Sequence, residues 1–315
     1  NNMVNLKVVK NRKIWLSLSA LLMATSIVFI FLWGFNFGID FTGGSLMEVK
    51  FSENSPSAFE IRDKLNDLNL SSLSVQPTED GTFILKFKQI DNGTHDLVFE
   101  RLNQYALDLN SLSVDQADEG EVKTFFEELR FDSVGPSIGK ELKSKSFNTV
   151  AIVLILIILY VAFVFRKVSK PVSSWNYGIS AIVALFHDVL IVLGVFAFLG
   201  KFYGTEINTP FIAAILTVLG YSVNDTIIVF DRIRENLPKS DDSFVGTIDK
   251  SINQTLVRSI NTSFTTLLVL LAILFFGGKT IMDFVLALSI GIFVGTYSSI
   301  FIASPLLVMF DKRRK

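Results

Sequence analysis

The chain has 315 residues, of which 50% are hydrophobic and only 19% charged, and its 30 phenylalanines and mean hydropathy of +0.47 are typical of a membrane protein. It has no cysteine and only two histidines, His95 and His187, which excludes disulfides, thiolate metal sites, cysteine nucleophiles and three-histidine metal centres. The net charge of −1 gives no reason to expect nucleic acid as a partner, and we expect neither an enzyme nor a bound cofactor or metal.

The charge is unevenly distributed along the chain. Residues 35–146 sum to −9 and the remaining residues to +8, a split that indicates two different environments. Apolar runs of about 20 residues are long enough to cross a bilayer as helices. Six such runs occur, at residues 14–34, 147–165, 177–199, 211–230, 258–277 and 284–310.

Clusters of lysine and arginine give the orientation of these runs. They precede the first run, follow the second and the fourth, and end the chain, and such clusters mark the cytoplasmic side. We therefore expect a polytopic α-helical membrane protein with six transmembrane helices and both termini in the cytoplasm. Its predicted parts are residues 1–34 (cytoplasmic N-terminus and first helix), 35–146 (extracytoplasmic domain), 147–310 (helices two to six) and 311–315 (basic cytoplasmic tail).

The segment between the first two runs has the pattern of a small α+β domain. Strand-like alternation at 45–51, 73–76, 82–88 and 123–134 is interleaved with helical spacing at 57–70 and 95–109. Ser57 and Glu60 form a capping-box signature, and residues 79–81 have the composition of a hairpin turn. The order βαββαβ predicts a ferredoxin-like module, in which His95 is better explained as a surface residue than as a ligand.

Ionisable residues are rare inside the six runs, and each is a candidate functional residue because charge in a bilayer costs at least a few kcal/mol. Asp225 lies about five residues from the cytoplasmic end of the fourth run, and Arg258 stands where the fifth run has to begin in order to cross the hydrocarbon. A contact between these two side chains is geometrically natural. It predicts either a structural ion pair or a proton relay, in which the distance to the arginine decides whether Asp225 binds or releases a proton.

Two further features lie in the third and sixth runs. His187 and Asp188 stand near the middle of the third run, where they either extend a relay or form a packed, hydrogen-bonded pair. Gly291 and Gly295 have the small-xxx-small spacing that allows two helices to approach closely, so we expect a packing role for them.

Five blocks of the sequence resemble the successive signature motifs of the SecF-type members of the SecD/SecF family, within the resistance–nodulation–division superfamily. These blocks are GIDFTGG at 38–44, VGPSIGKEL at 134–142, LTVLGYSVNDTIIVFDRIREN at 216–236, TLVRSINTSFTT at 255–266 and IGIFVGTYSSIFIASPLL at 290–307. By this resemblance the family's buried aspartate falls on Asp225 and its arginine on Arg258. Asn224 and Thr262 belong to the same two motifs. The glycine-rich junction between the first span and the outer domain falls on Gly38, Asp40, Gly43 and Gly44.

The resemblance implies a function and a set of partners. Members of the family are auxiliaries of the bacterial Sec protein-export machinery in the inner membrane, and they are thought to use the proton motive force to move their outer domains during late steps of preprotein translocation. The implied partners are a SecD half (separate or fused), the SecYEG channel, preproteins delivered by SecA, YajC and YidC, besides the lipid bilayer.

Two other functions are consistent with the same residues. One is a proton-driven half of a small-molecule or lipid exporter of the superfamily, although residues 35–146 are few for a large substrate cleft. The other is a membrane scaffold without proton chemistry, in which Asp225 and Arg258 only hold helices together. Replacing Asp225 by asparagine distinguishes a relay from a scaffold, and copurification with SecYEG distinguishes an export factor from an exporter.

Overall fold

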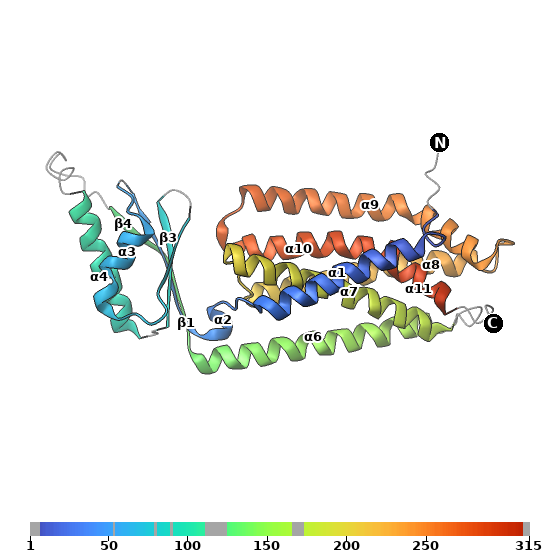
Figure 1. The fold of residues 1–315 in the computed structure, drawn as a ribbon, viewed down its shortest axis with the longest axis horizontal. Coiled ribbons are helices and arrows are strands. Elements are labelled where there is room, and N and C mark those ends of the chain that lie inside the picture. Colours follow the sequence, from blue (N-terminus) through green and yellow to red (C-terminus); the bar gives the residue numbers. More distant parts are fainter. Residues whose placement is uncertain are drawn as a thin grey trace. The chain divides into compact units, whose positions relative to one another are not determined.

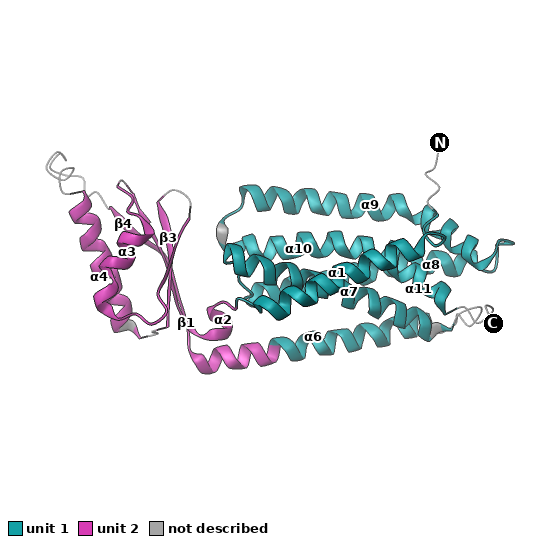
Figure 2. Ribbon diagram, viewed as in Figure 1, with its two compact units in different colours: residues 1–36, 146–315 teal, residues 37–145 magenta. Residues whose placement is uncertain are grey.

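The structure is a computed structural model that describes residues 7–52, 54–78, 81–88, 91–110, 125–165 and 173–310. Two compact units divide the chain, unit 1 with Asn1–Asn36 and Ser146–Lys315, and unit 2 with Phe37–Lys145 (Figure 2). Residues 79 and 80 of the predicted hairpin turn and the basic tail 311–315 lie outside the described residues.

Unit 1 contains long apolar helices, which are labelled in Figure 1. They are α1 (Arg12–Trp33), α6 (Pro136–Val164, whose first turns belong to unit 2), α7 (Ser174–Tyr203), α8 (Thr209–Asn236), α9 (Phe244–Phe276) and α10 (Lys279–Ser298), followed by the π-helical turn η2 (Ser299–Ala303) and α11 (Ser304–Met309). Six helical segments of the described chain are long and apolar enough to span a membrane, and each overlaps one of the six predicted runs. The prediction of a mostly helical membrane protein is therefore confirmed.

The interior of unit 1 is formed by three of these helices. At least half of the most apolar stretch is buried in α7, in α8 and in α10 with its continuation, but less than a fifth in α1, α6 and α9. Helix α10 packs against α7, α8 and α9, and α1 packs against α7 (Figure 1). Polar side chains that point between α7, α8 and α10 are therefore removed from both lipid and water.

Two helices begin well before the apolar runs that predicted them. Helix α9 begins after Ser243, whose Oγ accepts a hydrogen bond from the backbone N–H of Gly246, and α6 begins at Pro136. The added turns are polar, and a hydropathy pattern detects only the part of a helix that matches the hydrocarbon. Helix α8 begins at Thr209, close to the predicted start at 211, after the cap Asn208 and with proline in its first turn.

In its described residues, unit 2 is a four-stranded antiparallel sheet with two main helices. In chain order it contains the one-turn helix α2 (Ile39–Thr42), β1 (Gly44–Phe51), α3 (Ala58–Lys64), the 3₁₀ turn η1 (Asn66–Leu68), β2 (Ser74–Pro77), β3 (Thr82–Phe87), α4 (Asn92–Leu109) and β4 (Phe126–Val134). The strand order is β2-β3-β1-β4, with Met47 opposite Leu85 and Phe131. The core is formed by alternate residues of the strands and by the inner faces of α3 and α4, among them Ile61 and Leu102.

Local contacts in unit 2 agree with the sequence pattern in two places. Ser57 and Glu60 form the expected capping box at the start of α3. His95 lies in the first turns of α4, where its Nδ1 is 2.9 Å from Asp96 Oδ1 and its Nε2 is 3.0 Å from Glu128 Oε2 on β4. Burial alone lowers the pKa of His95, but the hydrogen bonds to Asp96 and Glu128 outweigh it and the pKa is raised above 6.5. His95 is therefore a link between α4 and β4.

The glycine-rich motif at 38–44 contacts the start of α6. Gly38 precedes α2, which contains Asp40. Gly43 has φ +73°, and a Cβ on it would lie 2.9 Å from Cα of Pro136. Gly44 has φ +132°, and its Cβ would lie 2.8 Å from the carbonyl oxygen of Phe87. Both positions therefore require glycine, because a side chain has neither the space nor the backbone conformation there.

Candidate functional site

Asp225 is a carboxylate in the interior of unit 1. It lies on α8 with 4% of its surface exposed, and its Oδ1 accepts a hydrogen bond of 2.5 Å from Ser259 Oγ on α9. Within the described residues, its Oδ2 has no hydrogen-bond partner. The side chain of Ser299, on the π-helical turn, lies beside the carboxyl group without a well-formed hydrogen bond to it. Among the described residues, one oxygen of Asp225 is therefore hydrogen-bonded and the other is buried without a partner.

The expected contact between Asp225 and Arg258 is absent from the described part of the chain. Arg258 is exposed on the surface of α9, and among the described residues no ion pair joins it to Asp225. The residue that faces Asp225 is the next one, Ser259, and successive residues of a helix point about 100° apart. The arginine is therefore turned away from the carboxylate that its neighbour contacts.

The two other residues of these motifs also lie at the surface of unit 1. Asn224 is exposed on α8, beside the buried Asp225. Thr262 is exposed on α9, and its hydroxyl donates to the carbonyl oxygens of Arg258 and Ser259. Of the six predicted relay residues, the structure therefore places Asn224, Arg258 and Thr262 on the outer surface of α8 and α9.

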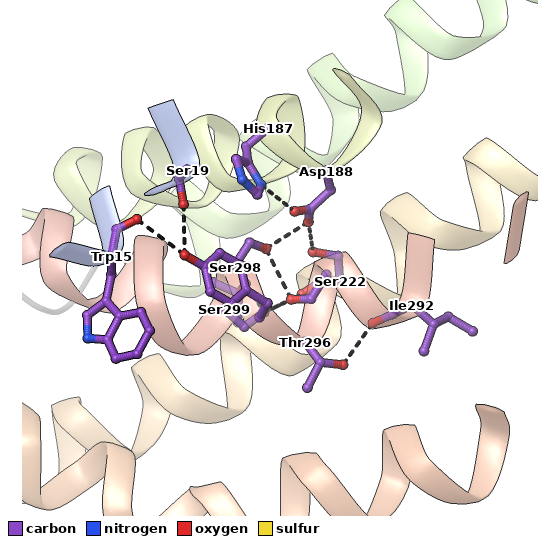
Figure 3. Close-up of polar contacts among 12 residues, drawn as sticks. Trp15, Ser19, His187, Asp188, Ser222, Ile292, Thr296, Ser298 and Ser299 are labelled. Atoms are coloured by element: carbon purple, nitrogen blue, oxygen red, sulfur yellow. Dashed lines mark hydrogen bonds and ion pairs between the residues drawn. The ribbon is translucent and has the colours of Figure 1, made fainter. Parts of the chain in front are cut away.

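His187 and Asp188 form a second buried polar cluster, on α7. They are 1% and 0% exposed, and His187 Nδ1 lies 3.0 Å from Asp188 Oδ1. Asp188 Oδ2 accepts hydrogen bonds from Ser222 Oγ on α8 (2.6 Å) and from Ser298 Oγ at the end of α10 (2.8 Å). Figure 3 shows these four side chains pointing toward one another. Three helices thus meet at one carboxylate.

Small residues make this meeting of helices possible. A Cβ on Gly291 would lie 2.2 Å from Val218 Cγ2, and a Cβ on Gly295 would lie 2.9 Å from Ser222 Cβ. At these two glycines α10 lies close to α8, and the small-xxx-small spacing is of the kind that allows such an approach. It brings Ser222 and Ser298 within reach of the same carboxylate oxygen.

The hydroxyl groups that hold both carboxylates were not identified from the sequence. Ser222 stands one turn before Asp225, Ser259 follows Arg258, and Ser298 and Ser299 continue the small-residue spacing of Gly291 and Gly295. The small size of serine is enough to explain such residues where helices pack closely. The sequence pattern therefore gave no sign that their hydroxyls bind carboxylates. The signal that could have found them is the number of serines in otherwise apolar spans, since a buried hydroxyl needs a partner.

Two family descriptions match the chain. Residues 116–313 match "Protein export membrane protein SecD/SecF, C-terminal", and residues 28–54, which include Gly43 and Gly44, match "SecD/SecF GG Motif". Protein translocase subunit SecF of Thermobaculum terrenum is 42% identical over 311 residues, which cover 97% of this chain and 94% of that protein. Protein translocase subunit SecF of Haemophilus influenzae is 39% identical over 97% of this chain and 86% of that protein.

A solved structure shows the same fold within a longer chain. The crystal structure of SecDF from Thermus thermophilus, a translocon-associated membrane protein, superposes with a TM-score of 0.76 at 36% identity. The match covers 97% of this chain but only 38% of the SecDF chain. Identity, coverage and fold agree, and the chain therefore belongs to the SecF branch of the SecD/SecF family of protein-export membrane proteins.

Proposed function

We propose that this chain is the SecF half of a SecDF-type complex that assists protein export in the bacterial inner membrane. In this proposal Asp225 takes up and releases protons, and unit 2 is a ferredoxin-like extracytoplasmic domain that moves in response. The sheet order β2-β3-β1-β4 and the βαββαβ sequence of elements support the ferredoxin-like assignment of unit 2. The basic clusters that follow the second and fourth spans support cytoplasmic termini and an outer unit 2.

The observation that carries the proposal is that Oδ2 of Asp225 is buried without a hydrogen-bond partner in the described structure. An ionised carboxylate in a buried site needs a cation or several donors, and in the described residues Asp225 has one hydroxyl and no cation. A proton can take the place of the missing partner, so the group is suited to change its protonation state. A proton that crosses the membrane potential releases about 2.3 kcal/mol per 100 mV, which is enough to shift a two-state equilibrium by more than tenfold.

A polar surface on α8 and α9 supports the presence of a second membrane half. Asn224, Arg258 and Asn261 are exposed there, and within the described residues their side chains make no hydrogen bond or ion pair. Exposing such groups to lipid costs free energy, so they normally face protein or a water-filled path. We infer that a SecD-like half, separate or fused, covers this surface and brings its own groups to Arg258. The fused arrangement is that of Thermus thermophilus SecDF, of which this chain matches 37% of the length.

The remaining partners and the direction of coupling follow from the same proposal. Movement of unit 2 would help draw an emerging preprotein outward from the SecYEG channel, after the SecA-driven step. YajC and YidC would be further neighbours in the membrane. The chain itself would catalyse no covalent reaction and would carry no cofactor.

The test is the replacement of Asp225 by asparagine in the complete complex. Asparagine keeps the shape and an acceptor oxygen for Ser259 but cannot exchange a proton. We expect export in membrane vesicles to lose its stimulation by a proton gradient, while the protein is present at wild-type levels. The matched control is Asp231→Asn, the same change on the same helix at an exposed carboxylate paired with Arg234.

Two outcomes would contradict the proposal. If the Asp225→Asn complex keeps normal stimulation by the proton gradient, Asp225 is only a structural residue and the chain is a scaffold. If the complex does not copurify with SecYEG but its loss sensitises cells to lipophilic compounds, the exporter function applies instead.

A further inference from the structure

The His187–Asp188 pair is the most buried ionisable cluster in the described part of the chain, and the mechanism proposed above does not use it. Asp188 is fully buried on α7, and its only ion-pair partner among the described residues is His187. The Nε2 atom of His187 is buried and has no partner in the described structure. A buried nitrogen of this kind normally has a hydrogen-bond partner, so Nε2 is the atom at which the ring can bind a proton.

The imidazole can carry a proton from this point to the carboxylate. A proton that binds at Nε2 makes the ring a cation, and the proton on Nδ1 then passes to Asp188 Oδ1, 3.0 Å away. The ring is left neutral with its proton on Nε2, and Asp188 becomes a neutral carboxylic acid. One proton enters and one proton is stored, so the step is balanced without any further reactant.

A proton on Asp188 weakens its side chain as a hydrogen-bond acceptor for the neighbouring serines. In the structure Ser298 Oγ has two acceptors, Asp188 Oδ2 at 2.8 Å and the carbonyl oxygen of Gly295 at 3.0 Å. A neutral carboxylic acid is a weaker acceptor than a carboxylate, so protonation shifts the Ser298 hydroxyl toward Gly295. Ser298 therefore senses the charge on Asp188.

The same carbonyl links Ser298 to the residue beside Asp225. Ser299 Oγ lies 2.9 Å from the carbonyl oxygen of Gly295, 3.3 Å from that of Ser222 and 2.9 Å from Thr226 Oγ1. Thr226 is the neighbour of Asp225 in sequence, and Ser299 lies beside the Asp225 carboxyl group. When Ser298 binds Gly295 more strongly, Ser299 is free to turn its hydroxyl toward the open Oδ2 of Asp225.

The backbone at this point is suited to such a change. Ser299 begins the π-helical turn η2, and Ser304 Oγ donates to the carbonyl oxygen of Ser299, which the wider turn leaves available. Single π-helical turns inside helices occur frequently at functional sites. Ser298, the last residue of α10, thus donates to Asp188, while Ser299, the first residue of the turn, contacts Thr226 next to Asp225.

We propose that the His187–Asp188 pair is a second proton-exchange site, and that Ser298 and Ser299 couple its protonation to that of Asp225. The proposal rests on the proposed function, because it concerns the same proton path. The titratable or charged groups that face the pair are few. Among the described residues, Tyr297 stacks on His187 with its hydroxyl bonded to Ser19 and to the carbonyl of Trp15. On α8, the neutral Ser222 contacts Asp188 directly, and Asp225 acts through Ser299.

The experiment uses the complete complex and infrared difference spectroscopy of buried carboxyl groups during a pH titration. In the Asp225→Asn complex we expect one buried carboxylic acid signal to remain and to titrate, and to be lost when Asp188→Asn is added. Compared with the wild-type complex, the Asp225→Asn complex should show a shifted titration midpoint for this Asp188 signal. When Ser299→Ala is present in both complexes, Asp225→Asn should cause no such shift. A complex without any such signal in the Asp225→Asn background would overturn the proposal.

Export stimulated by a proton gradient gives the second measurement. We expect Asp188→Asn and His187→Gln each to reduce it by about tenfold, and Ser299→Ala to reduce it less. Asp188→Asn keeps acceptor oxygen for Ser222 and Ser298, and His187→Gln leaves Asp188 intact, so one variant remains informative if the other does not fold. The matched control is Ser180→Ala, which removes a fully buried hydroxyl of α7 that has no partner in the described residues.

The outcomes separate the two proposals. If Asp225→Asn abolishes stimulation while Asp188→Asn and His187→Gln behave like Ser180→Ala, the second site does not exist and the role of Asp225 stands. If Asp225→Asn leaves the stimulation by the proton gradient unchanged, the proposed function itself is wrong.

Discussion

The packing of α10 against α8 depends on the absence of a side chain at Gly291. A Cβ at this position would lie 2.2 Å from Cγ2 and 2.8 Å from Cγ1 of Val218, well inside van der Waals contact. Relief of such overpacking typically costs about 1–3 kcal/mol, and the better helix propensity of alanine offsets about 1 kcal/mol of it. We therefore expect Gly291→Ala to lower the free energy of unfolding by about 1 kcal/mol.

The measurement is denaturant unfolding of the full chain in detergent, with two comparison variants. Val218→Ala removes both Cγ atoms, so the double variant Gly291→Ala/Val218→Ala should be more stable than the two separate losses predict, because the nearest remaining atom is Cβ at 3.0 Å. Gly220→Ala on α8 meets no atom within 4 Å and should stabilise the helix by about 0.5–1 kcal/mol. If Gly291→Ala is as stable as Gly220→Ala, or if Val218→Ala gives no rescue, the close approach of the two helices is not what the structure indicates.

Two further predictions concern unit 2. Gly43→Ala should destabilise the full chain by about 1–2 kcal/mol in the same unfolding assay, because φ is +73° and the new Cβ meets Pro136, whereas Gly135→Ala has open space and should be nearly neutral. His95 should titrate by NMR above 6.5, and Glu128→Gln should lower its midpoint, because the hydrogen bonds to Asp96 and Glu128 raise the pKa of His95 against the effect of burial. Folding raises the pKa of His95, so its contacts between α4 and β4 stabilise unit 2 fully below pH 6.5, and this stabilisation is lost as the pH rises through the pKa of His95 in the folded protein. An unchanged titration midpoint of His95 in Glu128→Gln would contradict this.

The membrane helices could be predicted because their signal is additive over many residues. A run of about 20 apolar side chains gives a span whatever the order of its members, so all six were found. The ends of α6 and α9 could not be predicted in the same way, since their first turns are polar and depend on local caps such as Ser243. The pairing of β2 with β3 agrees with the predicted hairpin, whereas the position of β1 between β3 and β4 comes from the structure.

The candidate site could be predicted only in part, and the reason is geometrical. Rarity of charge in the spans identifies Asp225, His187 and Asp188, and the structure buries all three. It does not identify their partners, because an error of one residue turns a helical side chain by about 100°. That error is the difference between the expected Arg258 and the observed Ser259.

The choice of serine as partner has a chemical consequence for a group that exchanges protons. A guanidinium carries a positive charge, so it strongly favours the ionised carboxylate and binds the neutral acid much less tightly. A hydroxyl is neutral and can donate to a carboxylate as well as to the carbonyl oxygen of a carboxylic acid, so the contacts of Ser259 with Asp225 and of Ser222 with Asp188 can persist in both protonation states. Helices joined by hydroxyls therefore stay packed while the charge changes, and a cation supplied from the surface of α9 or from a partner can control the change without having to hold the helices together.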